Sequence, residues 1–206
     1  ILLGVGALEL VLHMAITGRL GIAPTLALRL GVHAIVLLMV VVGGRVTPAF
    51  TRNALRGVAD VRAANRLDTV AIVAVVAVLA LLAIPRVPGF VAGGACALAA
   101  VLNAARMRGW ASRAAARVPL LCILHVGYAW LVVGLALEAL AFLRPALVPA
   151  SAALHAFTAG AVGSYGLGMM SRVSLGHTGR PLVASRITTM AFVAVVASGC
   201  VRVGAG

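Results

Sequence analysis

Residues 119–141 read PLLCILHVGYAWLVVGLALEALA, an apolar run in which Glu138 is the only formally charged residue. A helix that crosses a membrane needs an apolar run of about 17–25 residues, and this stretch meets that length. Runs of similar character recur along the chain at about 1–17, 28–44, 69–84, 88–105, 150–170 and 186–203. No alternation of strand period appears among them. The sequence therefore predicts an all-α, polytopic transmembrane helix bundle with about seven spans, forming one transmembrane domain over residues 1–206.

The composition excludes an ordinary soluble domain. Charged residues make up 10% of the chain and acidic residues number four, whereas about a quarter of a soluble protein is charged. The net charge of +13 would suggest a nucleic-acid partner in a soluble protein. Here the basic residues lie between apolar runs, which is typical of membrane loops. We therefore expect a lipid bilayer as the surroundings and no nucleic-acid partner.

The arginines also predict the orientation. Loops 45–68, 106–118 and 171–186 hold twelve of the seventeen basic residues, all of which are arginine. Loops on the cytoplasmic side of a membrane are enriched in basic residues, and these three loops share one side in a seven-span chain. We expect these three loops to be cytoplasmic.

Polar residues inside the apolar runs are candidates for function, because ionisable groups are costly in lipid. From the helical rise per residue, His13, His33, His155 and Glu138 fall at one level, about 5–7 Å below the outer surface. Neutral imidazole is a common ligand of haem iron and copper, and facing helices can supply two ligands. Two other interpretations stay open for this level: hydrogen bonds between helices, and a path for protons or ions.

Three further polar residues lie elsewhere. Glu9 precedes His13 by four residues and therefore shares its helix face, where it would orient His13 or carry protons. His125 lies about 9 Å from the cytoplasmic surface. Two roles stay open for it: a ligand of a second metal centre, or a hydrogen-bonding partner between helices. His177 lies in the last arginine-rich loop. It could be a ligand, a proton relay or part of a structural clamp formed by the loop.

Several motifs resemble the NnrS family of bacterial membrane proteins. Residues 43–53 read GGRVTPAFTRN, which is similar to the family's GGR-x-x-P-x-FT motif. Residues 124–131 (LHVGYAWL), 154–160 (LHAFTAG) and 170–181 (MSRVSLGHTGRP) also resemble that family. The resemblance extends from about residue 13 to residue 182.

This resemblance implies an inner-membrane protein with haem and copper that acts in nitric oxide metabolism and protects against nitrosative stress. It implies metal ligands among His33, His125 and His155, with His13 next, and it leaves open which histidine binds which metal. Arg172 and Arg180 are candidates to hold haem propionates. Because family members have about twelve spans, we expect the chain to be a fragment. Catalytic residues are not identified. Three activities stay open: binding of nitric oxide, oxidation of nitric oxide, and removal of a nitrosyl group from iron complexes.

The alternative from another class is a proton- or ion-coupled transporter. Glu9, Glu138 and the histidines inside the spans would then form its path, with no haem or copper present.

Overall fold

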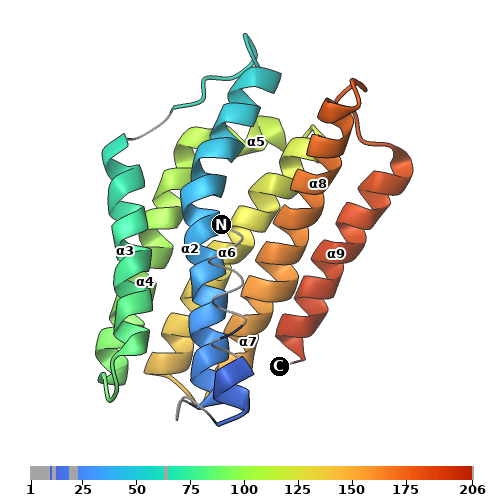
Figure 1. The fold of residues 1–206 in the computed structure, drawn as a ribbon. Coiled ribbons are helices and arrows are strands. Elements are labelled where there is room, and N and C mark those ends of the chain that lie inside the picture. Colours follow the sequence, from blue (N-terminus) through green and yellow to red (C-terminus); the bar gives the residue numbers. More distant parts are fainter. Residues whose placement is uncertain (1–9, 11–12, 19–22, 63–64, 206) are drawn as a thin grey trace.

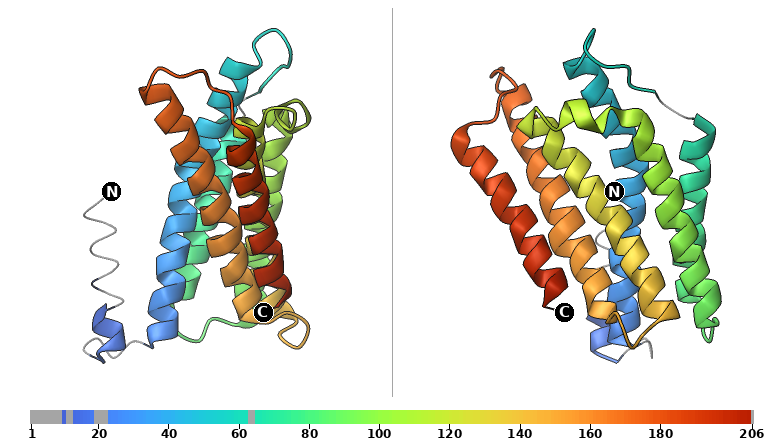
Figure 2. Two further views of the ribbon diagram at one scale, coloured as in Figure 1. Left: turned by 90° about the vertical axis from the view of Figure 1, so that its right-hand side faces the viewer. Right: turned by 180° about the vertical axis from the view of Figure 1, so that it is seen from behind.

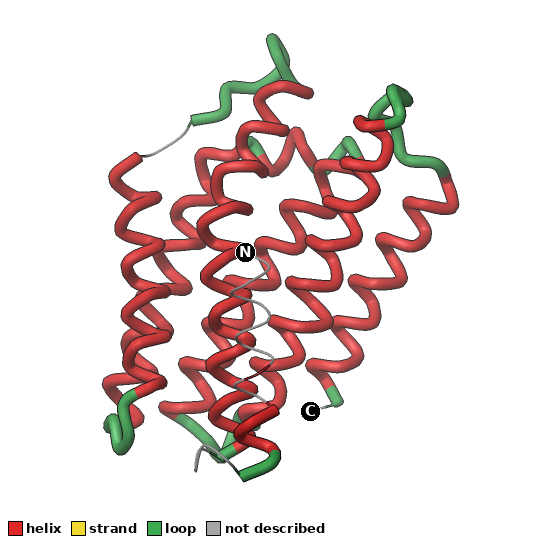
Figure 3. The backbone as a smooth tube through the Cα atoms, viewed as in Figure 1, coloured by secondary structure: helices red, strands yellow, loops and turns green. Residues whose placement is uncertain are grey.

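The computed structural model describes residues 10, 13–18, 23–62 and 65–205, and within them every regular element is a helix (Figures 1 and 3). The elements are α2 (Pro24–Ala54), α3 (Asn65–Ala83), α4 (Gly89–Met107), the short 3₁₀ helix η1 (Arg108–Trp110), α5 (Ser112–Ala115), α6 (Pro119–Leu143), α7 (Ala150–His155), the π-helical η2 (Ala156–Val162), α8 (Gly163–His177) and α9 (Arg186–Gly204). The predicted helical membrane bundle is confirmed.

Five helices in the described part of the chain are long and apolar enough to cross a membrane. They coincide with the runs predicted at 28–44, 69–84, 88–105, 119–141 and 186–203. The count differs from the predicted seven for two reasons. The run at 150–170 is helical throughout but is divided into α7, η2 and α8, and most of the run at 1–17 lies outside the described residues.

The helices form two layers around α6. Seen from behind, α9, α8, α6, α4 and α3 lie side by side in that order, and α2 packs on the far side of this row against α3 and α6 (Figure 2). Five leucines of α6, among them Leu124 and Leu131, are completely buried, and α6 contacts α2, α4, α5, α7, η2, α8 and α9. Helix α6 is thus the centre of the bundle, although its sequence has no distinct polar face.

Glycine allows three close contacts between these helices. A Cβ atom built on Gly127 of α6 would lie 2.7 Å from the backbone nitrogen of Tyr165 in α8. A Cβ on Gly160 of η2 would lie 2.6 Å from the Trp130 ring, and Gly199 of α9 meets the backbone of Gly160. Small residues permit backbones to approach in lipid, where apolar side chains gain nothing from leaving water.

The loops separate into two ends of the bundle. The arginine-rich end carries the loops 55–64, 108–118 and 178–185, and the opposite end carries the loops 84–88 and 144–149 (Figure 1). The predicted loop boundaries need correction, because α2 continues to Ala54 and α8 continues to His177. At about 1.5 Å per residue, the 31 residues of α2 span about 46 Å, well beyond the hydrocarbon core of about 30 Å. Polar residues at its end therefore remain helical outside the lipid.

Candidate functional site

A buried ionic cluster near the opposite end joins α2 to α6. Nη2 of Arg29 donates to Oε1 of Glu138 at 2.8 Å, and Nε2 of His33 lies 2.6 Å from Oε2 of the same carboxylate. His33 is completely buried, and Glu138 is 3% exposed. The prediction that His33 and Glu138 share one level is confirmed, and Arg29 joins them as the countercharge.

The bonds of His33 define what its ring can do. Nδ1 lies 2.8 Å from the carbonyl oxygen of Arg29, which can only accept, so Nδ1 carries a hydrogen. Nε2 shares a proton with the Glu138 carboxyl group. Both nitrogens are therefore occupied, and a metal can reach this imidazole only after one of the two bonds breaks.

The other residues predicted at this level are not brought into that cluster. His155 ends α7 and is half-buried, and its ring makes no hydrogen bond to any part of the chain that the structure describes. His13 is exposed. Glu9 lies outside the described residues. Among the buried or half-buried histidines predicted as ligands within the spans, His155 is thus the one whose ring nitrogens form no hydrogen bond within the described residues.

His125 lies in a second network, near the arginine-rich end. Its Nε2 is 2.9 Å from Oγ1 of Thr51, and its Nδ1 is 2.9 Å from Oγ of Ser112. Thr51 already donates its hydroxyl hydrogen to the carbonyl oxygen of Thr47, so it accepts from Nε2–H of His125. Ser112 then donates to Nδ1 of the neutral ring. The structure therefore shows His125 as a hydrogen-bonding link between helices, with both nitrogens engaged.

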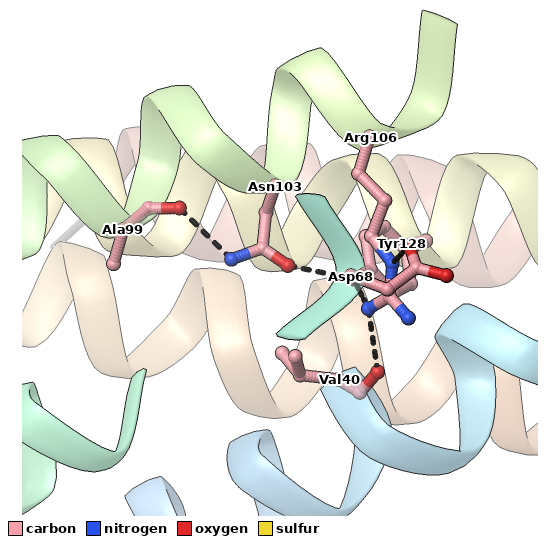
Figure 4. A network of polar contacts seen from close by, with 6 residues as sticks. All are labelled: Val40, Asp68, Ala99, Asn103, Arg106 and Tyr128. Carbon is pink, nitrogen blue, oxygen red and sulfur yellow. Dashed lines mark hydrogen bonds and ion pairs between the residues drawn. The ribbon is translucent and has the colours of Figure 1, made fainter. Parts of the chain in front are cut away.

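Arg106 crosses from α4 to α2 in a third network (Figure 4). Its Nε donates to Asp68 of α3 at 2.5 Å, and its Nη1 donates to the carbonyl oxygen of Val40 at 2.8 Å and to the Tyr128 hydroxyl at 3.0 Å. Tyr128 donates to Oδ1 of Asn103 at 2.6 Å. The Arg106 side chain is 1% exposed, and its Nη2 has no hydrogen-bond partner among the described residues. A buried donor without a partner costs about 1–3 kcal/mol.

The segment 43–51 connects these inner networks, and nearly every motif residue has a contact of its own. Gly43 leaves room for the Tyr165 ring, and Gly44 leaves room for the Arg106 guanidinium, which a side chain at residue 44 would overlap. Thr47 hydrogen-bonds the Tyr165 hydroxyl at 3.0 Å. The GGR-x-x-P-x-FT pattern is thus a packing and hydrogen-bonding surface along α2.

The basic residues of 171–186 lie in different environments. Arg172 is 8% exposed, and its guanidinium lies 4.1 Å from the centre of the Phe50 ring. His177 and Arg172 both line a cavity of about 290 Å³. Arg180 is exposed and follows the end of α8. Arg172 therefore joins α8 to α2, whereas Arg180 faces away from the core.

The donor set fits a metal only in part. The described residues contain no group of three or more His, Cys, Asp or Glu side chains placed to hold a metal ion. His155 offers a free imidazole, and the rings of His33 and His125 are committed to hydrogen bonds. A copper site would need ligands beyond those that the described residues bring together, whereas a haem iron needs one axial imidazole, which His155 could offer.

The central role of Arg106 was not predicted from the sequence, in which this arginine is one of the basic residues of loop 106–118. The available signal was the pair of polar side chains at Asp68 and Asn103, which stand at the ends of two apolar runs and need partners in the bundle.

The comparisons place the chain among known sequences. The family model described as "NnrS protein" matches residues 1–206. No curated protein and no solved structure matches the chain.

Proposed function

The chain belongs to the NnrS family, and on that premise we propose that it acts in nitric oxide metabolism at the bacterial inner membrane, as part of a haem- and copper-containing protein that protects against nitrosative stress. The observation that carries the proposal is the family match over the whole chain. Haem iron and copper would supply the site at which nitric oxide binds.

His155 is the residue that we propose as a ligand. Its ring has no hydrogen bond within the described chain, and it stands directly before the π-helical turns of η2. Single π-helical insertions in α-helices are frequent at functional sites, since they change the direction of side chains along one helix face. The remaining ligands would come from other parts of the protein.

We propose a different part for His33, Glu138 and Arg29. Their closed cluster holds α2 against α6 and places a shared proton at Nε2 of His33. A cavity of about 60 Å³ beside Arg29 and Glu138 exceeds the volume of one water, about 30 Å³. We propose that the arginine-rich end of the bundle is cytoplasmic and that the other end, near which the cluster lies, is periplasmic. The cluster is therefore suited to exchange protons with the periplasmic side.

The test is a visible spectrum of the purified full-length protein, reduced and oxidised, with metal analysis and anaerobic addition of nitric oxide. The proposal expects a haem absorption band that shifts with nitric oxide, and copper at near-stoichiometric amounts. A protein with neither haem nor copper refutes it.

A proton-coupled transporter is the second candidate, favoured by the proton shared between His33 and Glu138. Proteoliposomes with a pH-sensitive dye in the lumen distinguish the two. Proton uptake that Glu138→Gln abolishes, in a protein without haem, supports transport.

A further inference from the structure

The arginine-rich end contains a cavity that the nitric oxide function does not use. It has a volume of about 340 Å³ and lies between α2, α3 and the junction of α4 with η1. Ligand sites commonly begin at about 300 Å³. The cavity is therefore large enough for a small ligand or for the head group of a larger one.

Three arginines reach this cavity from two helices. Arg45 and Arg52 are seven residues apart on α2, which places them on one face two turns apart. Both are exposed, so the cavity communicates with the surface. Arg106 enters from α4 and forms the inner wall together with Trp110.

The inner wall holds a donor with no partner. Nε and Nη1 of Arg106 are bound to Asp68, Val40 and Tyr128, whereas Nη2 makes no hydrogen bond. Figure 4 shows this nitrogen at the end of the guanidinium without a contact. Because Nη2 is fully buried, a ligand oxygen in the cavity reaches it only after the Arg106 side chain shifts, and until then Arg106 contributes positive charge to the inner wall.

The charge of the cavity defines the ligand further. Asp68 is the only acidic residue in the lining and is paired with Nε of Arg106, so the three arginines leave two positive charges in excess. An uncharged ligand would leave the charges of Arg45 and Arg52 without a counterion in the cavity. Inorganic phosphate or a phosphate monoester near neutral pH carries about two negative charges, the phosphodiester of a lipid head group carries one, and both offer several acceptor oxygens.

We propose that this cavity binds a phosphate group, held by Arg45 and Arg52 at the mouth and attracted by the positive charge of Arg106 at the inner wall. The group belongs either to a soluble phosphate or to the head group of an anionic lipid at the membrane surface. The site differs from the proposed haem and copper ligands, because Arg106 and His155 lie toward opposite ends of the bundle.

The experiment measures thermal unfolding of the full-length protein, first in detergent with increasing inorganic phosphate. Chloride at matched ionic strength is the control for screening. The second arm uses nanodiscs of phosphatidylcholine with increasing phosphatidylglycerol. The variants are Arg45→Gln and Arg52→Gln, and the matched control is Arg117→Gln, which removes one exposed arginine at the same end without lining the cavity.

We expect a saturable rise in Tm whose apparent Kd increases at least tenfold in Arg45→Gln and Arg52→Gln and changes less than twofold in Arg117→Gln. A response to phosphate identifies a soluble ligand, and a response to phosphatidylglycerol alone identifies the lipid. The absence of a saturable rise in both arms overturns the proposal, as does an equal response in all the variants. Neither result bears on haem content.

Discussion

Replacing Gly44 by alanine tests the inner network at the point where the motif and Arg106 meet. A Cβ at residue 44 would overlap the Arg106 guanidinium, so Arg106 must withdraw from Val40 and Tyr128. A hydrogen bond to a charged group contributes about 1.5–3 kcal/mol. Alanine in a helix gains back at most about 1 kcal/mol over glycine.

We therefore expect the free energy of unfolding of Gly44→Ala to fall by about 2–4 kcal/mol. For a domain of this size the fall lowers Tm by roughly 5–10 °C. The assay is thermal unfolding in detergent followed by near-ultraviolet circular dichroism, which reports Trp110 and Tyr128 packing.

Gly94→Ala is the matched control for this variant. Gly94 is also a helical glycine, and a Cβ built on it meets nothing within 4 Å. Its stability should be unchanged or raised by up to about 1 kcal/mol. If Gly44→Ala is as stable as Gly94→Ala, the proposed packing of Arg106 against α2 is wrong.

Two further variants test the polar contacts between helices. Glu138→Gln removes the charge that faces Arg29, so we expect a loss of about 3 kcal/mol in the free energy of unfolding; a loss below about 1 kcal/mol in the same thermal assay would show that the ion pair contributes little. Tyr165→Phe removes the hydroxyl bonded to Thr47 and should cost about 1 kcal/mol. A double-mutant cycle with Thr47→Val measures this bond, and strict additivity of the two changes would argue against it.

The sequence was sufficient for the architecture because lipid imposes a simple length rule on helices. The apolar runs gave five spans close to their observed positions. The ends were less predictable. Residues 45–54 are polar and basic in part, yet they remain helical because α2 extends past the lipid.

The site was predicted in part. Helical rise alone placed His33 and Glu138 at one depth, and the structure brings them to 2.6 Å. The same reasoning placed His155 at that depth but had no information on which way each helix faces. Burial of Arg106 was not predictable from its position at the end of an apolar run, because the partners come from three other helices.

The central claim is that His155, and neither His33 nor His125, is the available ligand in this part of the protein. The direct measurement is haem and copper content of the full-length protein after His→Ala at each of the three positions, with exposed His177→Ala as control. Our account predicts that His155→Ala loses the cofactor, while His33→Ala and His125→Ala retain it with a lower Tm. Retention in His155→Ala, with loss in either of the other two, would contradict the account.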